Sequence, residues 1–283
     1  MSGLYFNIAE LAREANDFKK IAAPVLDRNT VWRLEQFSAH IEGIRSTTGA
    51  HIRPFELEGL WTKPTLTYDR SPGRPVRACI DGIWEISRVE SEGSRRGRRQ
   101  RERTNRNVRL ISFSGKASLR IAIYEDDAEE DWTPPPVSCD DLGERGTNKC
   151  SRLAMWRIEL GRLGAPGPYF HMHALGDRDS PPFPKWLPIP RLPSYFVTPM
   201  GALEFCLGEL FQDEWRRRVE ESTAPVSSWC SMQERRLGRL LHWLRCCAIQ
   251  SGNASAWMNL KRATPPEDLF VRERGTCAVC GGG

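Results

Sequence analysis

A chain of 283 residues is long enough to bury a sizeable core in one large domain or two small ones. Apolar residues make up 40% of it and charged residues 27%, which is typical of a soluble globular protein, and no run approaches the roughly 18 uncharged apolar residues of a membrane span. The net charge of +5 is by itself only weak evidence for a polyanionic partner.

The first twenty residues mix acidic and basic side chains and lack the apolar middle and small-residue cleavage site of a secretory signal. The nine cysteines are odd in number and irregular in spacing, which argues against a disulfide framework. We therefore expect a cytoplasmic protein with no membrane partner, whose cysteines are free thiols or metal ligands.

Residues 1–50 are expected to form an N-terminal helical segment. A first helix is indicated by the apolar spacing of Ile8, Leu11, Ala12, Ala15 and Phe18. A second helix is expected to begin after Asn29 or Thr30, since either residue could cap it. Its apolar stripe would be Val31, Leu34, Phe37, Ile41 and Ile44.

Residues 51–197 are expected to form an antiparallel sheet, because from about residue 65 apolar and polar residues alternate with a period of two. "VRACIDGIWEISRV" predicts a hairpin that turns at Asp81-Gly82, a favoured two-residue turn. "VRLISFSGKASLRIAIY" predicts a second hairpin that turns at 114–117, and "MWRIELGRLGAPGPYFHMHAL" a third with a Gly/Pro-rich loop. Successive hairpins favour a β-meander.

The stretch 181–199 contains seven prolines, which exclude a helix and favour an extended connector over one face of the sheet. The alternative is that it is a ligand for an aromatic groove. Residues 198–272 are expected to be helical, with Thr198 as N-cap, Pro199 in the first turn and a further helix over about 228–248. A Cys/Gly tail follows at 273–283. Helices, then an antiparallel sheet, then helices make an α+β fold.

Two of the five histidines lie two positions apart in the third predicted hairpin, and strand alternation places His171 and His173 on one face. The register that buries the apolar faces of both strands together pairs Ile158 with Met172 and Leu160 with Phe170. That register also sets Glu159 opposite His171 and Arg157 opposite His173.

Such a cluster favours one of two chemistries. His171 and His173 could share one metal ion with Glu159 as a further ligand or an outer partner. Alternatively, His171, His173, Glu159 and Arg157 form a catalytic group, with a histidine as base, Arg157 stabilising an anion and Asp177 nearby. The simplest alternative is a set of cross-strand polar pairs on a solvated sheet face.

An arginine run lies between two predicted strands, in the loop 94–107. "SRRGRRQRERTNRNVR" contains eight arginines and one acid, and clustered arginines suit phosphate oxygens. The candidate nucleic-acid-binding residues are Arg95, Arg96, Arg98, Arg99, Arg101 and Arg103. The opposing feature is the acidic run 125–132, with six acids, which could neutralise the arginines, since both runs are expected to leave the same end of adjacent strands.

The chain ends "RERGTCAVCGGG", and Cys277 and Cys280 have the spacing of a zinc knuckle. A structural zinc site needs four ligands, so the other two must come from elsewhere, and otherwise the pair are idle tail thiols. The candidates are Cys139, Cys150, Cys230, Cys246, Cys247 and the histidine pair.

The last glycines resemble the flexible diglycine with which ubiquitin-like modifiers end, so Gly282 and Gly283 are a candidate conjugation tail for a protein partner. The alternative is a frayed, glycine-rich terminus.

These features favour an intracellular interaction protein whose basic loop engages nucleic acid or another polyanion, with zinc as the candidate cofactor. A metal-dependent, nuclease-like hydrolase built on the His-x-His strand is the second hypothesis. Attachment through the Gly-Gly tail in a ubiquitin-like conjugation system is the third.

Overall fold

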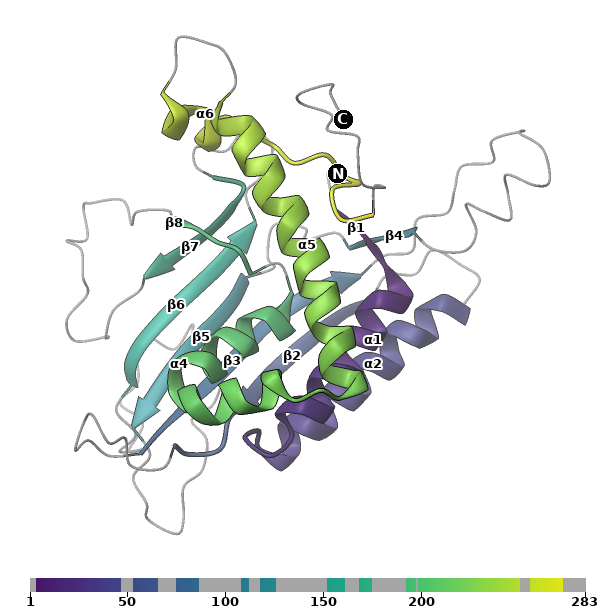
Figure 1. Ribbon diagram of the computed structural model, residues 1–283, viewed down its shortest axis with the longest axis vertical. Helices are drawn as coiled ribbons and strands as arrows, with labels where there is room; N and C mark the ends of the chain where they lie inside the picture. The colour runs from purple at the N-terminus through teal and green to yellow at the C-terminus, as the bar shows by residue number, and fades with distance from the viewer. Residues whose placement is uncertain are drawn as a thin grey trace.

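Helices at both ends of the chain pack on one face of an antiparallel sheet, so the fold is α+β (Figure 1). The computed structural model describes residues 4–46, 53–65, 75–86, 108–111, 118–125, 152–160, 168–174, 192–196, 198–249 and 255–271. The helices are α1 (Ile8–Ala22), α2 (Arg28–Ser46), α4 (Pro199–Glu220), α5 (Ala224–Ala248) and α6 (Ala256–Arg262). The strands are β1 (Leu4–Asn7), β2 (Arg53–Trp61), β3 (Val76–Ile86), β4 (Val108–Ile111), β5 (Ser118–Glu125), β6 (Arg152–Leu160), β7 (Phe170–Ala174) and β8 (Leu192–Pro193).

The first predicted helix is confirmed as α1, which Asn7 caps by accepting hydrogen bonds from the backbone N–H groups of Ala9 and Glu10. The predicted start of the second helix is wrong, because α2 already begins at Arg28 and Asp27 accepts from the N–H of Asn29. Thr30 has another partner. Its buried hydroxyl accepts from the Trp61 N–H at 2.6 Å and donates to the Trp61 carbonyl at 2.8 Å, which ties α2 to the end of β2.

The sheet follows the order β1-β4-β3-β5-β6-β7-β8, and β2 also pairs with β3. All described strand pairs are antiparallel. The third predicted hairpin is confirmed as β6 and β7, and β5 to β8 run as a meander.

Two predicted hairpins are wrong. β3 continues straight through Asp81-Gly82, because Gly82 pairs with Leu57 of β2 on one side and with Leu119 of β5 on the other. Because β3 already pairs with β2 and β5, its two halves do not fold back on each other through a turn. In the second case β4 does not pair with β5. It pairs with β1 and, through Ile111, with the end of β3.

The core lies between the sheet and the helices. Ile80, Ile121 and Ile158, from three neighbouring strands, are almost fully buried on this face. Aromatic contacts join the layers: Trp156 meets Phe205 of α4, and Phe170 meets Trp243 of α5. The residues that alternate with these isoleucines along the strands lie on the opposite face of the sheet.

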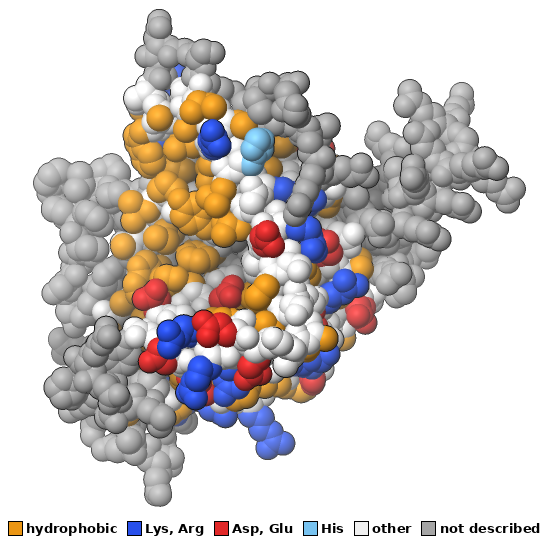
Figure 2. Space-filling view, viewed as in Figure 1, with side chains coloured by type: hydrophobic (Ala, Val, Ile, Leu, Met, Phe, Trp, Pro, Cys, Tyr) orange, Lys and Arg blue, Asp and Glu red, His pale blue; other side chains and the backbone are white. Residues whose placement is uncertain are grey.

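The predicted start of the C-terminal helical region is confirmed, since Thr198 caps α4 by accepting from the Gly201 N–H and Pro199 lies in the first turn. The next helix, α5, begins at Ala224, earlier than expected, and the sequence did not indicate β1 or α6. Hydrophobic side chains gather around α5 and α6, whereas charged ones gather around α4 (Figure 2). Within the described ranges, no helix has both the length and the apolar character needed to cross a membrane.

Candidate metal centre

The predicted register of the His-x-His strand is confirmed. β6 and β7 pair Glu159 with His171 and Arg157 with His173, as well as Ile158 with Met172 and Leu160 with Phe170. Directly opposed residues of an antiparallel pair share one face, so the two histidines, Glu159 and Arg157 lie together. Because Ile158 and Phe170 belong to the core on the helical side, this group lies on the face turned away from α4 and α5.

The side chains of Glu159, His171 and His173 converge, as three candidate metal ligands would. Oε2 of Glu159 lies 3.4 Å from Nε2 of His171 and 3.4 Å from Nε2 of His173. The two imidazole rings meet edge to face, with their centroids 5.1 Å apart. Both histidines are buried, at 2% and 5% exposure, whereas Glu159 keeps 28% of its side chain exposed. The group is thus open to solvent on the carboxylate side.

Two of the three side chains, His171 and Glu159, are held by contacts from outside the group. Nδ1 of His171 lies 2.9 Å from the carbonyl oxygen of Pro168, and a carbonyl can only accept, so this nitrogen carries the proton. The other ring nitrogen, Nε2, faces Glu159; it donates to the carboxylate when the ring is protonated, and it would lose that proton on binding a metal. On the carboxylate, Oε1 takes an ion pair from Arg157 Nε at 2.8 Å, which leaves Oε2 for the histidines.

The carboxyl of Glu159 is strongly acidic. Its polar contact with His171 is the largest cause that lowers its pKa, and the positive charges of Arg157 and His173 add to it. Partial burial acts in the opposite direction, and the net result is a pKa of about 2. Glu159 is therefore a carboxylate at every physiological pH, which is the form that binds metals.

The spacing of the ligand atoms fits a small divalent ion. Two atoms bound at about 2.0–2.1 Å to a tetrahedral zinc lie about 3.3–3.4 Å apart, and both Nε2–Oε2 separations are 3.4 Å. All three ligand atoms lie within 4.8 Å of one another. An ordinary N–H···O hydrogen bond is shorter, about 2.9–3.0 Å. Two histidines and a carboxylate, with outer partners on two of the three ligands, fit a metal site.

The described strand ends that precede the arginine and acidic runs, Ile86 and Glu125, lie at opposite ends of the sheet, so the expectation that the runs follow the same end is wrong. Glu125 ends β5 and pairs with Val76, the first residue of β3. The arginine run begins eight residues after Ile86, the last residue of β3. Ile86 is ten residues from Val76, which is about 33 Å along the strand.

The last residue of β3, Ile86, lies at the end of the sheet that carries Glu159 and His171, and the chain leads from it toward the arginine run. Glu159 pairs with Ser118, the first residue of β5, and β5 begins beside the end of β3. The segment that holds the arginines therefore starts from the end of the sheet where Glu159 and His171 lie.

Several predicted site residues lie outside the described residues and stay predictions. They are Arg95, Arg96, Arg98, Arg99, Arg101, Arg103, Asp177, Cys277, Cys280, Gly282 and Gly283. Most of the proline-rich connector, 181–191, also lies outside.

Sequence reasoning missed two polar pairs. Glu14 of α1 and Arg236 of α5 form a buried ion pair at 2.7 Å, and the available signal was an acid within the apolar stripe of the first helix. His242 and Cys246 lie on α5 with Nε2 and Sγ 3.6 Å apart. Their spacing of four places both on one helix face, a signal that could have been read from the sequence.

Comparison of the chain with protein-family models, with curated proteins and with solved structures finds no match. The function is therefore inferred from the residues of the site alone.

Proposed function

We propose that Glu159, His171 and His173 bind one divalent transition metal, with zinc as the first choice, and that the centre hydrolyses a polyanionic substrate of the nucleic-acid type. The observation that carries the proposal is the convergence of three ligand atoms with Nε2–Oε2 separations of 3.4 Å. This is the second of the hypotheses that the sequence raised, joined to the first through the arginine run.

The number of ligands favours catalysis over a structural role. Structural zinc sites use four protein ligands, whereas catalytic sites use three and keep the fourth position for a water whose pKa the ion lowers to about 7. Here the histidines are buried and Glu159 is the partly exposed member. A substrate would therefore approach from the side of the carboxylate.

Arg157 has two roles in the proposal. Its contact with Oε1 orients Glu159, and it keeps 37% of its side chain exposed. A guanidinium has five N–H donors, so one ion pair leaves donors for an anionic group on the substrate. An arginine beside the ligands also stabilises the negative charge that develops during phosphate-ester hydrolysis.

The arginine run supports a polyanionic substrate. The strand that precedes it, β3, ends on the side of the sheet that carries Glu159 and His171, whereas Glu125, which begins the acidic run, lies beside the start of β3. The six arginines of Arg95–Arg103 would supply binding that depends on phosphates and not on base sequence.

Metal content is the first test. The purified full chain should hold about one zinc per molecule by mass spectrometry, and the double substitution His171→Ala/His173→Ala should remove it. Glu209→Gln, an exposed glutamate on α4, and His40→Ala on α2 are matched controls that should keep the metal. Metal retained by the double variant, or none in the wild type, would refute the centre.

Hydrolysis is tested separately with single-stranded DNA, duplex DNA, RNA and a chromogenic phosphodiester, each with zinc, manganese or magnesium. Turnover of at least one of them should require metal and disappear in His171→Ala. If metal binds and nothing is cleaved, the hydrolase is refuted and the metal centre stands. If the protein binds nucleic acid but neither binds metal nor cleaves a substrate, the result would instead support the first hypothesis, a non-catalytic polyanion-binding protein.

A further inference from the structure

The side of α5 that faces away from the core carries apolar side chains. Leu237 and Leu241 lie four residues apart and Ile249 follows eight residues later, so the three lie along one stripe of the helix. All three are exposed, and Ile249 keeps 69% of its surface accessible to solvent. The core side of α5 is supplied by other residues, among them Leu240 and Trp243. The exposed stripe therefore adds nothing to the core, although it is apolar.

α6 lies beside α5 and extends this apolar surface. Trp257 and Met258 are exposed, and none of the seven residues of α6 is buried, although most of its sequence, AWMNLKR, is apolar. Hydrophobic side chains gather around the two helices on one face of the molecule (Figure 2). Single exposed hydrophobic residues are common on proteins, but a group shared by two neighbouring helices marks an interaction surface. This α5–α6 surface consists of Leu237, Leu241, Ile249, Trp257 and Met258.

The charges around the α5–α6 surface are all positive. The sequence from Leu237 to Arg262 contains four Lys or Arg residues and no Asp or Glu. Arg245 lies on the exposed stripe of α5, and Lys261 and Arg262 end α6. Among the residues that the structure describes, no acid forms an ion pair with any of these three side chains. The surface thus has a positive charge that the described part of the chain does not neutralise.

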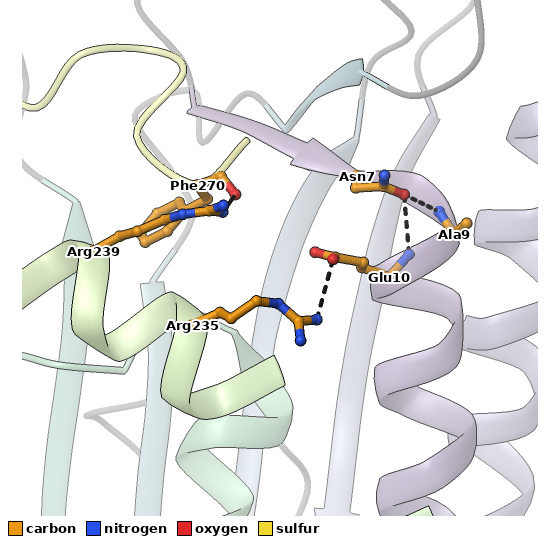
Figure 3. Close-up of polar contacts among 6 residues, drawn as sticks. All are labelled: Asn7, Ala9, Glu10, Arg235, Arg239 and Phe270. Carbon is orange, nitrogen blue, oxygen red and sulfur yellow. Dashed lines mark hydrogen bonds and ion pairs between the residues drawn. The ribbon is translucent and has the colours of Figure 1, made fainter. Parts of the chain in front are cut away.

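Cations earlier in α5 are engaged within the protein. Figure 3 shows Arg235 directed at Glu10 of α1 and Arg239 directed at the carbonyl oxygen of Phe270. Arg236, between them, forms the buried ion pair with α1. These arginines stabilise the fold, whereas the three cations beside the α5–α6 surface are left for an external partner.

An anionic membrane surface fits this combination of side chains. Aliphatic side chains and a tryptophan ring enter the boundary between lipid headgroups and acyl chains, and adjacent Arg and Lys side chains bind the headgroup phosphates. A nucleic acid offers no aliphatic layer for Leu241 and Ile249, because its bases stack on aromatic rings. A second copy of the chain would bring the same three cations against one another across a symmetric interface.

We propose that the α5–α6 surface binds the anionic surface of a membrane, with its apolar side chains at the headgroup boundary and Arg245, Lys261 and Arg262 on lipid phosphates. Such binding involves one leaflet and requires no spanning helix. The expectation of no membrane partner was based on the absence of a spanning run, which does not bear on contact with one leaflet. The metal-ligand group lies on the other face of the sheet and would face away from the membrane. This proposal does not depend on the function proposed for that group.

The test measures binding of the full chain to lipid vesicles by cosedimentation. Vesicles that contain phosphatidylserine should bind the wild type at least about 10-fold more tightly than vesicles of phosphatidylcholine alone. Leu241→Ser/Trp257→Ser should weaken binding to the phosphatidylserine vesicles about 100-fold, because two apolar side chains no longer enter the lipid boundary. Arg245→Ser/Arg262→Ser should weaken it about 10-fold or more at low salt concentration. All four residues are exposed, so both variants should keep the circular dichroism spectrum of the wild type.

Matched controls separate this surface from general exposure and general charge. Trp32→Ser removes a tryptophan of α2 that is 57% exposed, and this variant should bind vesicles as the wild type does. Arg216→Ser/Arg217→Ser, on α4, removes two positive charges elsewhere and should weaken binding much less than the Arg245 variant. Vesicles with brominated acyl chains should quench the tryptophan fluorescence of the wild type and of Trp32→Phe, and that of Trp257→Phe far less.

Equal binding of the wild type and Leu241→Ser/Trp257→Ser to phosphatidylserine vesicles would overturn the proposal, as would a wild type that binds no vesicles. In the second case, a wild type that is dimeric in analytical ultracentrifugation and a double variant that is monomeric would assign the surface to a second copy of the chain. Weaker binding of single-stranded DNA by the double variant would assign it to nucleic acid instead.

Discussion

His171 donates a hydrogen bond from Nδ1 to the carbonyl oxygen of Pro168, 2.9 Å away and three residues earlier in the chain. This bond fixes the neutral imidazole in one tautomer and one orientation. A histidine that binds metal through Nε2 almost always donates its other ring nitrogen in this way. The local path of the chain into β7 therefore holds the imidazole in the orientation that the proposed metal centre requires.

The tautomer is directly measurable. In protein freed of metal by chelation, ¹⁵N-detected imidazole spectra at pH 8 should show His171 protonated at Nδ1. Addition of zinc should shift Nε2 of His171 and His173 together, at one equivalent of metal. His40, on α2, is the internal control and should not shift. A His171 protonated at Nε2, with no response to zinc, would contradict the assignment.

Glu159 gives a pH-dependent prediction for the metal-free protein. Its pKa is about 2 in the folded state, below the usual 4.5, so folding favours the carboxylate. The stabilisation is fully present above about pH 4.5, because there the unfolded chain is ionised too, and it is lost as the pH falls toward 2. Urea unfolding should show Glu159→Gln less stable by about 1–2 kcal/mol at pH 7, after allowance for the partial exposure of the side chain. The difference should vanish near pH 2.

An equal difference at pH 7 and at pH 2.5 would mean that packing, and not the charge, explains the loss. Glu209→Gln is the matched control, because this exposed glutamate of α4 has no comparable contacts with histidine or arginine in the described structure. It should unfold as the wild type does at every pH.

The register of β6 and β7 could be predicted because it depends on local alternation. Only one pairing buries Ile158 against Met172, and that pairing dictates which polar residues oppose each other. The metal-ligand group follows from two strands joined by a short loop. The contacts that hold the group from outside could not be predicted, because the sequence does not reveal the direction of the Pro168 carbonyl.

The hairpin at Asp81-Gly82 was wrongly predicted because long-range strand pairing, and not local sequence, decides the structure there. The two residues favour a turn, but β2 and β5 pair along both edges of β3, and the partners of Gly82, Leu57 and Leu119, lie 25 and 37 positions away. Local turn chemistry loses to pairing between distant segments, which no local pattern reveals. The buried Glu14–Arg236 pair was missed for the same reason, since its members are 222 positions apart.

That buried pair supplies a prediction for stability. Glu14 is fully buried, and its Oε1 forms an ion pair with Nη1 of Arg236 at 2.7 Å and accepts a hydrogen bond from the Thr198 hydroxyl at 2.7 Å. Arg236→Met should lower the free energy of unfolding by about 3–5 kcal/mol, because it leaves a buried carboxylate without its cation. The double change Glu14→Leu/Arg236→Met should recover much of the loss. Urea denaturation of the three proteins measures both, and a double variant as unstable as Arg236→Met would contradict the argument.

Thr198 gives a smaller effect with a clean control. Its hydroxyl accepts from the Gly201 N–H at the start of α4 and donates to Glu14. Thr198→Ala removes both contacts and should cost about 1–3 kcal/mol. Thr198→Ser keeps the hydroxyl and should cost less than half as much. Thermal unfolding of the two variants distinguishes the hydrogen bonds from the packing of the methyl group, and equal losses would assign the effect to the methyl.

The arginine run is tested through salt dependence. Each arginine that neutralises a phosphate of duplex DNA contributes about 0.9 to the slope of log K against log salt concentration. Arg98→Ser/Arg99→Ser should therefore lower that slope by about 2 if both arginines contact phosphates. Arg216→Ser/Arg217→Ser, on α4, changes the net charge equally and is the matched control. Fluorescence anisotropy with a labelled duplex at several salt concentrations measures the slopes. Equal slopes for the two double variants would mean that the run adds only general charge, and the polyanion would then have to be recognised at the metal centre itself.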